Sequence, residues 1–600
     1  MKRNAVLMAS AVALALVLVL LLVATPADGA GTGSHNHRPR HAAAAAGAGT
    51  TSTRPLKKHR VSKSSFHTSQ GRERDPTREY AGQGTSHLRH VPAPGEKVMP
   101  VPLEQGVHAW QPAVRAELEH IVSSELGDQY LSLLPSLSDV ESGVPEQIKI
   151  SVTARGGELV LNWLTWTNSS TNAQIGTASG QYGAVLSGQT TPFVDPNSLH
   201  LVRYLHNVLV TNVQPKTQYF YRVGDATSGV WSDEQSTRTV PDGSNPADLV
   251  PVAMYGDLGL VNSQSMALLS DDVAKGGVAA VIQVGDFSYN MDELQGMNGD
   301  FFLRDLQNVT AKVPFMGCAG NHEQAFNFSH LANKFSNWNY VSDPLGRPDQ
   351  NWWYSFDLAS GGVLTHYISL DTELYYWDYL RGESTAPGRE ELKGNYPAMI
   401  AAQWHWLVDD LTRAYDSGKY AWIVAYGHRP LYCSNVDSIN DCTSDAELLR
   451  KGPGGMYGFE AAFSVRPLDV YFAAHEHSYE RTYPVSNGGT VDWKSVATNN
   501  LYVSPSAPVH IIAGSAGCRE YFDTFDEVFY GAFSAFRSAT YGYGRMTVHN
   551  ATHLHWEQLI DEGNAPSDHL WVQKKPRQHL VAEQPEQKPK KPAQPRIALE

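Results

Sequence analysis

The chain has 600 residues, of which 42 % are hydrophobic, 18 % charged and 10 % aromatic, and this composition excludes a wholly disordered or collagen-like protein. Its 47 Lys and Arg residues against 61 Asp and Glu residues give a net charge of −14, so we expect no nucleic acid as a partner. Four cysteines in this length cannot form a disulfide framework, and any bridge is local. A chain of this length is expected to hold several domains.

We expect residues 1–30 to be an export signal. Lys2 and Arg3 precede an uninterrupted run of small and apolar residues from 5 to 24. The run is long for a cleavable signal peptide and about right for a spanning helix, which needs ~20 residues, so a signal anchor is an equal alternative. The basic flank keeps the N-terminus in the cytosol in both cases. The protein is therefore expected in the secretory pathway: secreted, in a lysosome- or vacuole-like compartment, or membrane-anchored with a lumenal or extracellular catalytic domain.

Glycosylation acceptor sites agree with export. Four Asn-x-Ser/Thr tripeptides occur, and each is a potential N-glycan site in an exported protein; they begin at Asn168, Asn308, Asn327 and Asn550. Such tripeptides are frequent by chance, so they add little to the evidence for export.

Two segments have compositions that cannot build a core. Residues 31–100 are rich in Gly, Ala, Ser, Thr, Arg and His, and we predict a disordered stalk. The histidines of this stalk are irregularly spaced, which favours a soluble, pH-sensitive linker over metal capture. Residues 573–600 are rich in Lys, Pro and Gln and are predicted to be a disordered tail. An N-terminal extension, residues 101–144, joins the stalk to the first domain.

The sequence between the stalk and the tail divides into two regions with different patterns of apolar residues. Residues 145–240 hold short alternating strands, such as 147–152 and 159–164, separated by Gly-Gly and Asn-Ser-Ser turns. They predict a small β-sandwich of fibronectin-like size. From 246 to 572, apolar strands alternate with longer helical segments such as 399–414, which indicates an α/β domain.

Five apolar strands of this α/β domain each run into residues that bind metals. The strands are 250–255, 278–284, 313–319, 420–426 and 468–474. The donors that follow them are Asp257, Asp286 with Tyr289, Asn321, His428, and His475 with His477. We expect these side chains to meet at one edge, because ligands bind at the carboxyl ends of strands in α/β sheets.

The chemistry of these side chains indicates two metal ions. Oxygen and imidazole donors without a thiolate suit iron, manganese or zinc and argue against copper(I) or an iron–sulfur cluster. One ion with open positions uses three or four protein ligands, so seven donors are enough for two ions if one carboxylate bridges them. Any one of these motifs alone is a common turn. The prediction rests on finding all of them at strand ends of one domain.

The motif set Asp-x-Gly, Gly-Asp-x-x-Tyr, Gly-Asn-His-Glu, a strand-end His and His-x-His resembles that of the purple acid phosphatases, a family of calcineurin-like metallophosphoesterases. The resemblance covers roughly residues 145–571. Tyr289 makes it specific, because relatives outside the purple group generally lack a tyrosine there. The resemblance implies a four-layer αββα catalytic domain preceded by a fibronectin III-like sandwich, as in the long plant and animal-type members.

The resemblance also implies a role for each motif residue. An iron(III) ion would be bound by Asp257, Tyr289, His477 and Asp286. The second ion, which is iron(II), zinc or manganese, would be bound by Asn321, His428, His475 and the shared Asp286. His322 would contact the phosphate.

The loop after His428 departs from the family pattern. Plant-type members have two further histidines where this chain has Asp437 and Ser438, so the donor of the leaving-group proton is not evident. Arg429 and Asp437 are the candidates. Cys433 and Cys442 flank this loop and could form a disulfide in an oxidising compartment, with a pair of free thiols as the alternative.

The function implied by the resemblance is that of an acid phosphatase, which hydrolyses phosphate monoesters by attack of a metal-bound hydroxide. A trivalent iron lowers the pKa of bound water below the value of about 7 that is typical of zinc, so this nucleophile persists in acid. Two alternatives remain: a phosphodiesterase or nucleotide pyrophosphatase using the same site, and a surface glycoprotein with a vestigial site. The sequence gives no indication of the oligomeric state.

Overall fold

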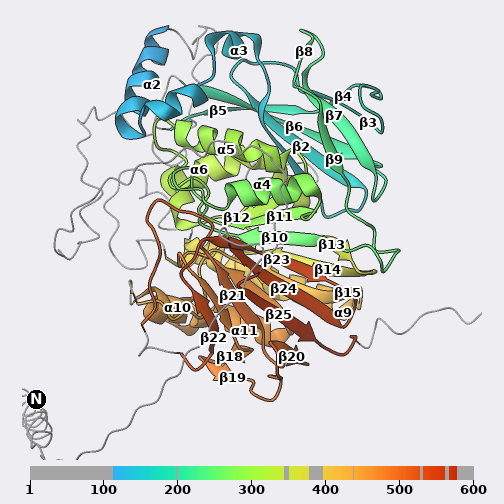
Figure 1. Cartoon of the computed structure of the whole chain (residues 1–600), viewed down its shortest axis with the longest axis vertical. Helices are drawn as coiled ribbons and strands as arrows, with labels where there is room; N and C mark the ends of the chain where they lie inside the picture. Colours follow the sequence, from blue (N-terminus) through green and yellow to red (C-terminus); the bar gives the residue numbers. More distant parts are fainter. Residues whose placement is uncertain are drawn as a thin grey trace, which may run out of the picture. The chain divides into compact units, whose positions relative to one another are not determined.

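The computed structural model describes residues 112–196, 201–342, 351–376, 396–436, 438, 440–526, 531–560 and 566–577 (Figure 1). The expected export signal, the stalk, residues 578–600 of the expected tail and Asp437 lie outside the described residues. Within the described ranges, no helix is both long and apolar enough to cross a membrane.

Short helices precede the first domain. They are α2 (Pro112–Glu125), the 3-10 helix η1 (Asp128–Leu133) and α3 (Leu137–Ser142). The hydroxyl of Ser136 accepts a hydrogen bond from the backbone N–H of Asp139 over 3.1 Å, which satisfies one of the free donors at the start of α3.

The first domain consists of two antiparallel sheets. One sheet has the order β1-β2-β6-β5, with strands Glu146–Val152, Glu158–Thr165, Val202–Thr211 and Gln189–Val194. The other has the order β4-β3-β7-β8 with β9 also paired to β7, and its strands are Leu186–Ser187, Asn172–Gly176, Gln218–Asp225, Val230–Trp231 and Gln235–Arg238. In β1 and β2 almost every residue is buried, on both faces of the sheet. A strand of alternating apolar and polar residues would leave one face of the sheet exposed to solvent. Because both faces are buried here, another part of the molecule must cover the second face.

That cover is helix α5 (Met297–Thr310), which packs against β1. The hydroxyl of Thr310 donates to the carbonyl of Ile148 over 2.8 Å. The hydroxyl of Tyr221, on β7, donates to the carbonyl of Ala311 just after the helix, over 2.7 Å. The first domain is therefore joined to the second by buried polar contacts as well as by its core.

The second domain contains two seven-stranded sheets. The first has the order β12-β11-β10-β23-β24-β25-β20, with strands Phe315–Cys318, Ala280–Val284, Pro251–Tyr255, Gly542–Val548, His553–Ile560, Asp568–Gln573 and Leu501–Val503. The second has the order β13-β14-β15-β16-β21-β17-β22, with strands Tyr354–Ser360, Val363–Ser369, Tyr420–Tyr426, Val470–Ala473, Val509–Ala513, Tyr479–Thr482 and Ser534–Ser538. A small hairpin pairs β18 (Val485–Ser486) with β19 (Thr490–Val491).

Helices cover the two sheets. Figure 1 shows α4 (Met266–Lys275), α5 and α6 (Ala325–Lys334) between the strands of the first domain and β10 to β12. Helix α9 (Tyr396–Asp416) packs against β15 and against α11 (Phe459–Val465). Two further α-helices of the described residues are α7 (Asn339–Ser342) and α10 (Ala446–Lys451). This α/β arrangement confirms the predicted class of the second domain.

The five strands singled out in the sequence do not share one sheet, and the expectation of a single edge is wrong. β10, β11 and β12 are parallel neighbours in the first sheet, whereas β15 and β16 are parallel neighbours in the second. The pattern of apolar runs cannot show this, because pairing joins segments far apart in the chain. β10, for example, pairs with β23 of the C-terminal part.

Candidate metal centre

Three of the predicted ligands meet at the ends of β10, β11 and β16. The hydroxyl of Tyr289 donates to Oδ1 of Asp257 over 3.1 Å and lies 2.8 Å from Nε2 of His477. Nε2 of His477 is 3.4 Å from the same carboxylate oxygen. These are the side chains that the resemblance assigns to iron(III), and the structure brings them together.

A second group lies at the ends of β11, β12, β15 and β16. Nε2 of His428 is 2.9 Å from Oδ1 of Asn321 and 3.3 Å from Oδ2 of Asp286. Asp286, His428 and His475 each offer a ligand atom, and these atoms lie within 4.8 Å of one another. This is the group expected around the second ion.

Asp286 acts on both groups. Its negative charge adds to burial and to Asp257 in raising the pKa of Tyr289 well above the ordinary value. Burial lowers the pKa of His428, but the charge of Asp286 outweighs it and raises that pKa to about 10. Oδ2 of Asp286 lies 3.3 Å from Nε2 of His428, and the charge of Asp286 also acts on Tyr289, as a bridging carboxylate requires.

The backbone adopts unusual conformations at these positions. Asp257, Asp286, Tyr289 and His475 have φ values of 58°, 48°, 58° and 71°. Left-handed backbone costs a non-glycine residue about 1–2 kcal/mol, and strain of this kind clusters at functional sites. The fold therefore holds these four residues in positions that local preference disfavours.

Gly285, which precedes Asp286, is required by close packing. Its φ is +80°, and a Cβ atom there would lie 2.4 Å from Nδ1 of His428 and 2.9 Å from the Cα of Gly320. A side chain at this position would push the two strand ends apart. The glycine thus sets the distance between Asp286 and His428.

The donor set fits metal cations. Asp257 and Asp286 are 0 % and 1 % exposed. Buried charges are normally paired or bound to metals. Burial lowers the pKa of His428, but the charge of Asp286 raises it to about 10, as expected where negative charge is in excess. Two cations would supply the missing positive charge.

Hydrogen bonds orient two of the histidines. Nδ1 of His428 donates to the carbonyl of Val284 over 2.9 Å, and Nδ1 of His477 donates to the carbonyl of Tyr521 over 3.1 Å. Each bond leaves Nε2 free to bind a metal. The buried thiol of Cys518, which the sequence did not assign to the site, lies 3.1 Å from Nδ1 of His477.

His322 lies at the margin of the centre. Its Nδ1 is 2.9 Å from Oδ1 of Asn290, while its Nε2 is 3.9 Å from Oδ2 of Asp286 and 3.7 Å from Oε1 of Glu520. Asn290 donates in turn to Oε1 of Glu293 over 2.6 Å. Sequence reasoning missed Asn290 and Glu520. Asn290 directly follows Tyr289 in its motif, whereas nothing in the local sequence marks Glu520.

Arg429 reaches the second group. Its Nε donates to both carboxylate oxygens of Glu373 at 3.0 Å, its Nη1 is 2.8 Å from Nε2 of His475, and its guanidinium stacks 4.2 Å from the ring centroid of Tyr376. Burial lowers its pKa, but the charge of Glu373 prevails and the net shift is upward. Arg429 therefore provides a fixed positive charge and is a poor source of a proton.

The loop that departs from the family pattern is closed by a disulfide between Cys433 and Cys442. Asp437, the other candidate acid, lies outside the described residues. A different carboxylate of this loop, Asp441, reaches the centre, with Oδ1 3.8 Å from both Nε2 of His475 and Nη1 of Arg429. Sequence reasoning missed Asp441, and its position next to Cys442 was the available signal.

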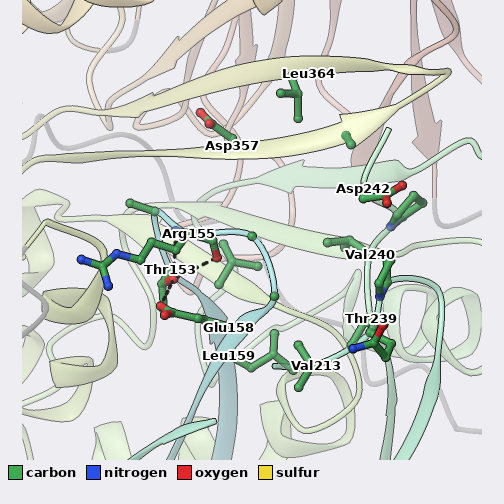
Figure 2. Close-up of a pocket in the computed structure, with 18 of the residues that line it drawn as sticks. Thr153, Arg155, Glu158, Leu159, Val213, Thr239, Val240, Asp242, Asp357 and Leu364 are labelled. Carbon is green, nitrogen blue, oxygen red and sulfur yellow. Dashed lines mark hydrogen bonds between the residues drawn. The ribbon is translucent and has the colours of Figure 1, made fainter. Parts of the chain in front are cut away.

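A pocket of about 330 Å³ lies elsewhere, where strands of the first domain face β13 and β14 (Figure 2). Its lining includes Thr153, Glu158, Asp242 and Asp357. None of the predicted metal ligands or catalytic residues lines it, so this pocket is not the candidate site.

The glycosylation acceptors are distributed over both domains. Asn168, Asn308 and Asn550 are exposed, as glycan attachment requires. Asn327 is half-buried, and its Oδ1 accepts a hydrogen bond from the hydroxyl of Tyr396 over 3.1 Å. Asn327 is therefore the least accessible of the four.

The fold and the two donor groups are those of a metallophosphoesterase, and comparison with known proteins gives the family. Residues 145–239 match the model of the purple acid phosphatase N-terminal domain, 250–479 that of the calcineurin-like phosphoesterases, and 507–568 that of the iron/zinc purple acid phosphatase-like protein C. The chain is 35 % identical over 435 residues to human acid phosphatase type 7, which covers 72 % of this chain and 91 % of the relative. The chain belongs to the purple acid phosphatase family.

Two further comparisons support the family assignment. Purple acid phosphatase 18 of Arabidopsis thaliana is 28 % identical over 442 residues, covering 72 % of this chain and 85 % of the relative. The structure of purple acid phosphatase PPD1 from yellow lupin (Lupinus luteus) seeds matches with a TM-score of 0.58 at 17 % identity, covering 73 % of this chain and 76 % of that one. This match supports the fold.

Proposed function

We propose that this protein is an acid phosphatase that hydrolyses phosphate monoesters at a dimetal centre. The observation that carries the proposal is the placement of two donor groups with Asp286 between them, in a chain of the purple acid phosphatase family. An ester of phosphate is the substrate class, and a phosphate dianion suits a centre that holds two cations.

We assign iron(III) to Asp257, Tyr289 and His477, and iron(II), zinc or manganese to Asn321, His428 and His475, with Asp286 shared. The donor chemistry supports this division, because a phenolate and carboxylates are hard donors suited to a trivalent ion. When bound, two such ions lower the pKa of water to supply the attacking nucleophile and neutralise the charge of the phosphate.

The protein's own side chains hold the substrate. His322 is oriented by Asn290 and presents Nε2 toward Asp286, so it is placed to contact a phosphate oxygen. Arg429 is fixed by Glu373 and adds positive charge beside His475. Preorganised donors of this kind stabilise charge that develops on the phosphate without having to reorient.

The export of the protein is part of the proposal. The Cys433–Cys442 disulfide and three exposed glycosylation acceptors are consistent with the secretory pathway. We propose residues 1–30 as a signal peptide or anchor, 31–100 and 573–600 as disordered segments, and 145–240 as a fibronectin III-like sandwich. Two antiparallel sheets of short strands support that last assignment.

The test combines metal analysis with a substrate panel. The full chain, expressed through a secretory pathway, should contain two metal ions and should hydrolyse p-nitrophenyl phosphate faster than bis(p-nitrophenyl) phosphate, with its optimum in acid. The matched inactive control is Asp286→Ala from the same expression. Preference for the diester would instead support the phosphodiesterase alternative. Two bound ions with no hydrolysis of either ester would support a vestigial site.

A further inference from the structure

Among the described residues, the ring of His322 is hydrogen-bonded through one of its two nitrogens. Nδ1 lies 2.9 Å from Oδ1 of Asn290. Nε2 lies 3.9 Å from Oδ2 of Asp286 and 3.7 Å from Oε1 of Glu520, and both distances exceed that of a hydrogen bond. The imidazole also packs against the ring of Tyr289, with centroids 4.6 Å apart. Nε2 is therefore the nitrogen that a ligand in the centre can reach.

The orientation of the Asn290 amide is fixed by its other partner. Nδ2 of Asn290 donates to Oε1 of Glu293 over 2.6 Å. The guanidinium of Arg519 pairs with this carboxylate, from Nη1 to Oε2 over 2.9 Å and from Nη2 to Oε1 over 3.1 Å. A carboxylate only accepts hydrogen bonds, so the amide NH₂ must face Glu293 and the amide oxygen must face His322. Because that oxygen is an acceptor, Nδ1 of His322 is the donor.

The turn that carries Asn290 and Glu293 is held from helix α5. The side-chain amide of Asn298, which is 2 % exposed, donates to the backbone carbonyls of residues 288–290 over 3.0, 3.1 and 3.1 Å. The backbone N–H of Glu293 donates to the carbonyl of Asn290 over 3.1 Å. The hydrogen-bonded chain that ends at His322 thus starts from a fixed backbone.

We propose that Glu293 and Arg519 are positioning residues that act through Asn290 and hold His322 with Nδ1 as the donor and Nε2 turned toward the phosphate. The inference rests on the proposed function, in which His322 contacts the substrate. Asn290, Glu293 and Arg519 are not among the assigned metal ligands, so their removal should change the affinity for phosphate and not the metal content. Arg519 comes from the segment after β21, so the C-terminal part of the chain takes part in holding the substrate.

The experiment measures the binding of inorganic phosphate by calorimetry to the full chain with its metals, together with kcat and KM for p-nitrophenyl phosphate. Asn290→Ala and Glu293→Ala should each weaken phosphate binding and raise KM by about 2–10-fold, because an orienting hydrogen bond is lost. The value of kcat should change less, since the contact is made in the ground state as well as in the transition state. Metal content and the visible absorption band of the iron should stay unchanged.

The matched control is Asp416→Ala. Asp416 pairs with Arg466 over 2.9 Å, and this partly exposed pair lies before the amino ends of β15 and β16, whereas the centre lies at their carboxyl ends. The substitution removes the carboxylate of a comparable arginine pair and should leave phosphate binding unchanged.

Two double variants separate positioning from stability. In the background of His322→Ala, Glu293→Ala should cause no further loss of phosphate affinity, because Glu293 acts through the imidazole. Additive losses would overturn this route. The exchange Glu293→Arg/Arg519→Glu rebuilds the ion pair but places a donor beside the amide of Asn290. The thermal unfolding midpoint should then match the wild type while phosphate binding stays weak. An exchange that also restores phosphate binding would overturn the role of Glu293 as acceptor.

Failure of the inference is distinguishable from failure of the proposed function. If the wild type binds phosphate and hydrolyses the ester while Asn290→Ala and Glu293→Ala bind phosphate as tightly, only the positioning role is overturned. Loss of iron or of the visible band in these variants would also overturn it, because the effect would lie in the metal ligands. A wild type that binds phosphate without hydrolysing the ester would overturn the proposed activity, and calorimetry of the variants would still decide the inference. A wild type that binds no phosphate would overturn both.

Discussion

Arg203 of the first domain and Asp300 of the second form a fully buried ion pair, with Nη2 of the arginine 2.7 Å from Oδ2 of the aspartate. Arg203 also donates to Asp195 over 2.8 Å, and Lys334 pairs with the other oxygen of Asp300. A charged side chain that is fully buried is stable only when an opposite charge and hydrogen bonds compensate it. The pair therefore ties the position of the first domain to helix α5.

Asp300→Ala should strongly destabilise the protein. The substitution leaves Lys334 without its carboxylate partner and Arg203 with Asp195 alone, so one positive charge in the interior is uncompensated, which costs about 3–5 kcal/mol. The measurement is the midpoint of denaturant unfolding. Asp271→Ala breaks an exposed pair with Lys275 and is the control, with an expected cost of at most about 1 kcal/mol. Equal shifts in the two variants would contradict an essential interdomain pair.

Asp286→Ala should lose both metal ions, because Asp286 is the carboxylate proposed to be shared. Elemental analysis of the purified variant is the measurement, with Asp271→Ala as a carboxylate control that keeps both ions. A variant that kept one full equivalent of metal would show that Asp286 serves a single ion.

Tyr289→Phe should bleach the protein while much of its activity remains. A phenolate bound to iron(III) absorbs visible light by charge transfer, and phenylalanine removes the oxygen without changing the packing of the ring, which is 1 % exposed. The visible spectrum and the iron content are measured together. An iron-containing wild type without colour would show that Tyr289 is not a ligand.

His366 should make the protein more stable in acid than in base. Burial lowers its pKa, but hydrogen bonds to Asp357 and Asp410, each 2.8 Å long, raise it to about 9. Because the folded pKa lies above the unfolded value of about 6.5, this contribution is complete below pH ~6.5 and is lost as the pH rises through 9. It amounts to at most about 3 kcal/mol.

The test compares the wild type with His366→Gln by thermal unfolding between pH 6 and 9. The wild type should lose stability over this range and the variant should lose less, because glutamine does not titrate. Parallel curves would assign the pH dependence to other groups.

Much of the centre could be predicted because its signals are local. A buried strand that ends in Gly-Asp or Gly-Asn-His is visible in a few consecutive residues, and the glycine is needed where two strand ends approach, as at Gly285 beside His428. The strands ending near Tyr255, Val284 and Tyr426 were accordingly placed to within a few residues.

The remaining features depend on contacts between distant segments. The division of the strands between two sheets is decided by partners such as β23, about 290 residues beyond β10. The same holds for Asp441, whose Oδ1 lies 3.8 Å from Nε2 of His475 although the two residues are 34 positions apart in the chain. Both faces of β1 are buried because α5 packs against it, and the alternating pattern of the strand could not predict this cover.

The donor groups at the two sheets have a consequence for the maturation of the protein. Each proposed ion takes ligands from both sheets: Asp257 from the first and His477 from the second for one ion, Asn321 from the first and His428 from the second for the other. Neither coordination sphere exists until the two sheets have packed together. Assembly of the sheets must therefore precede full metal loading.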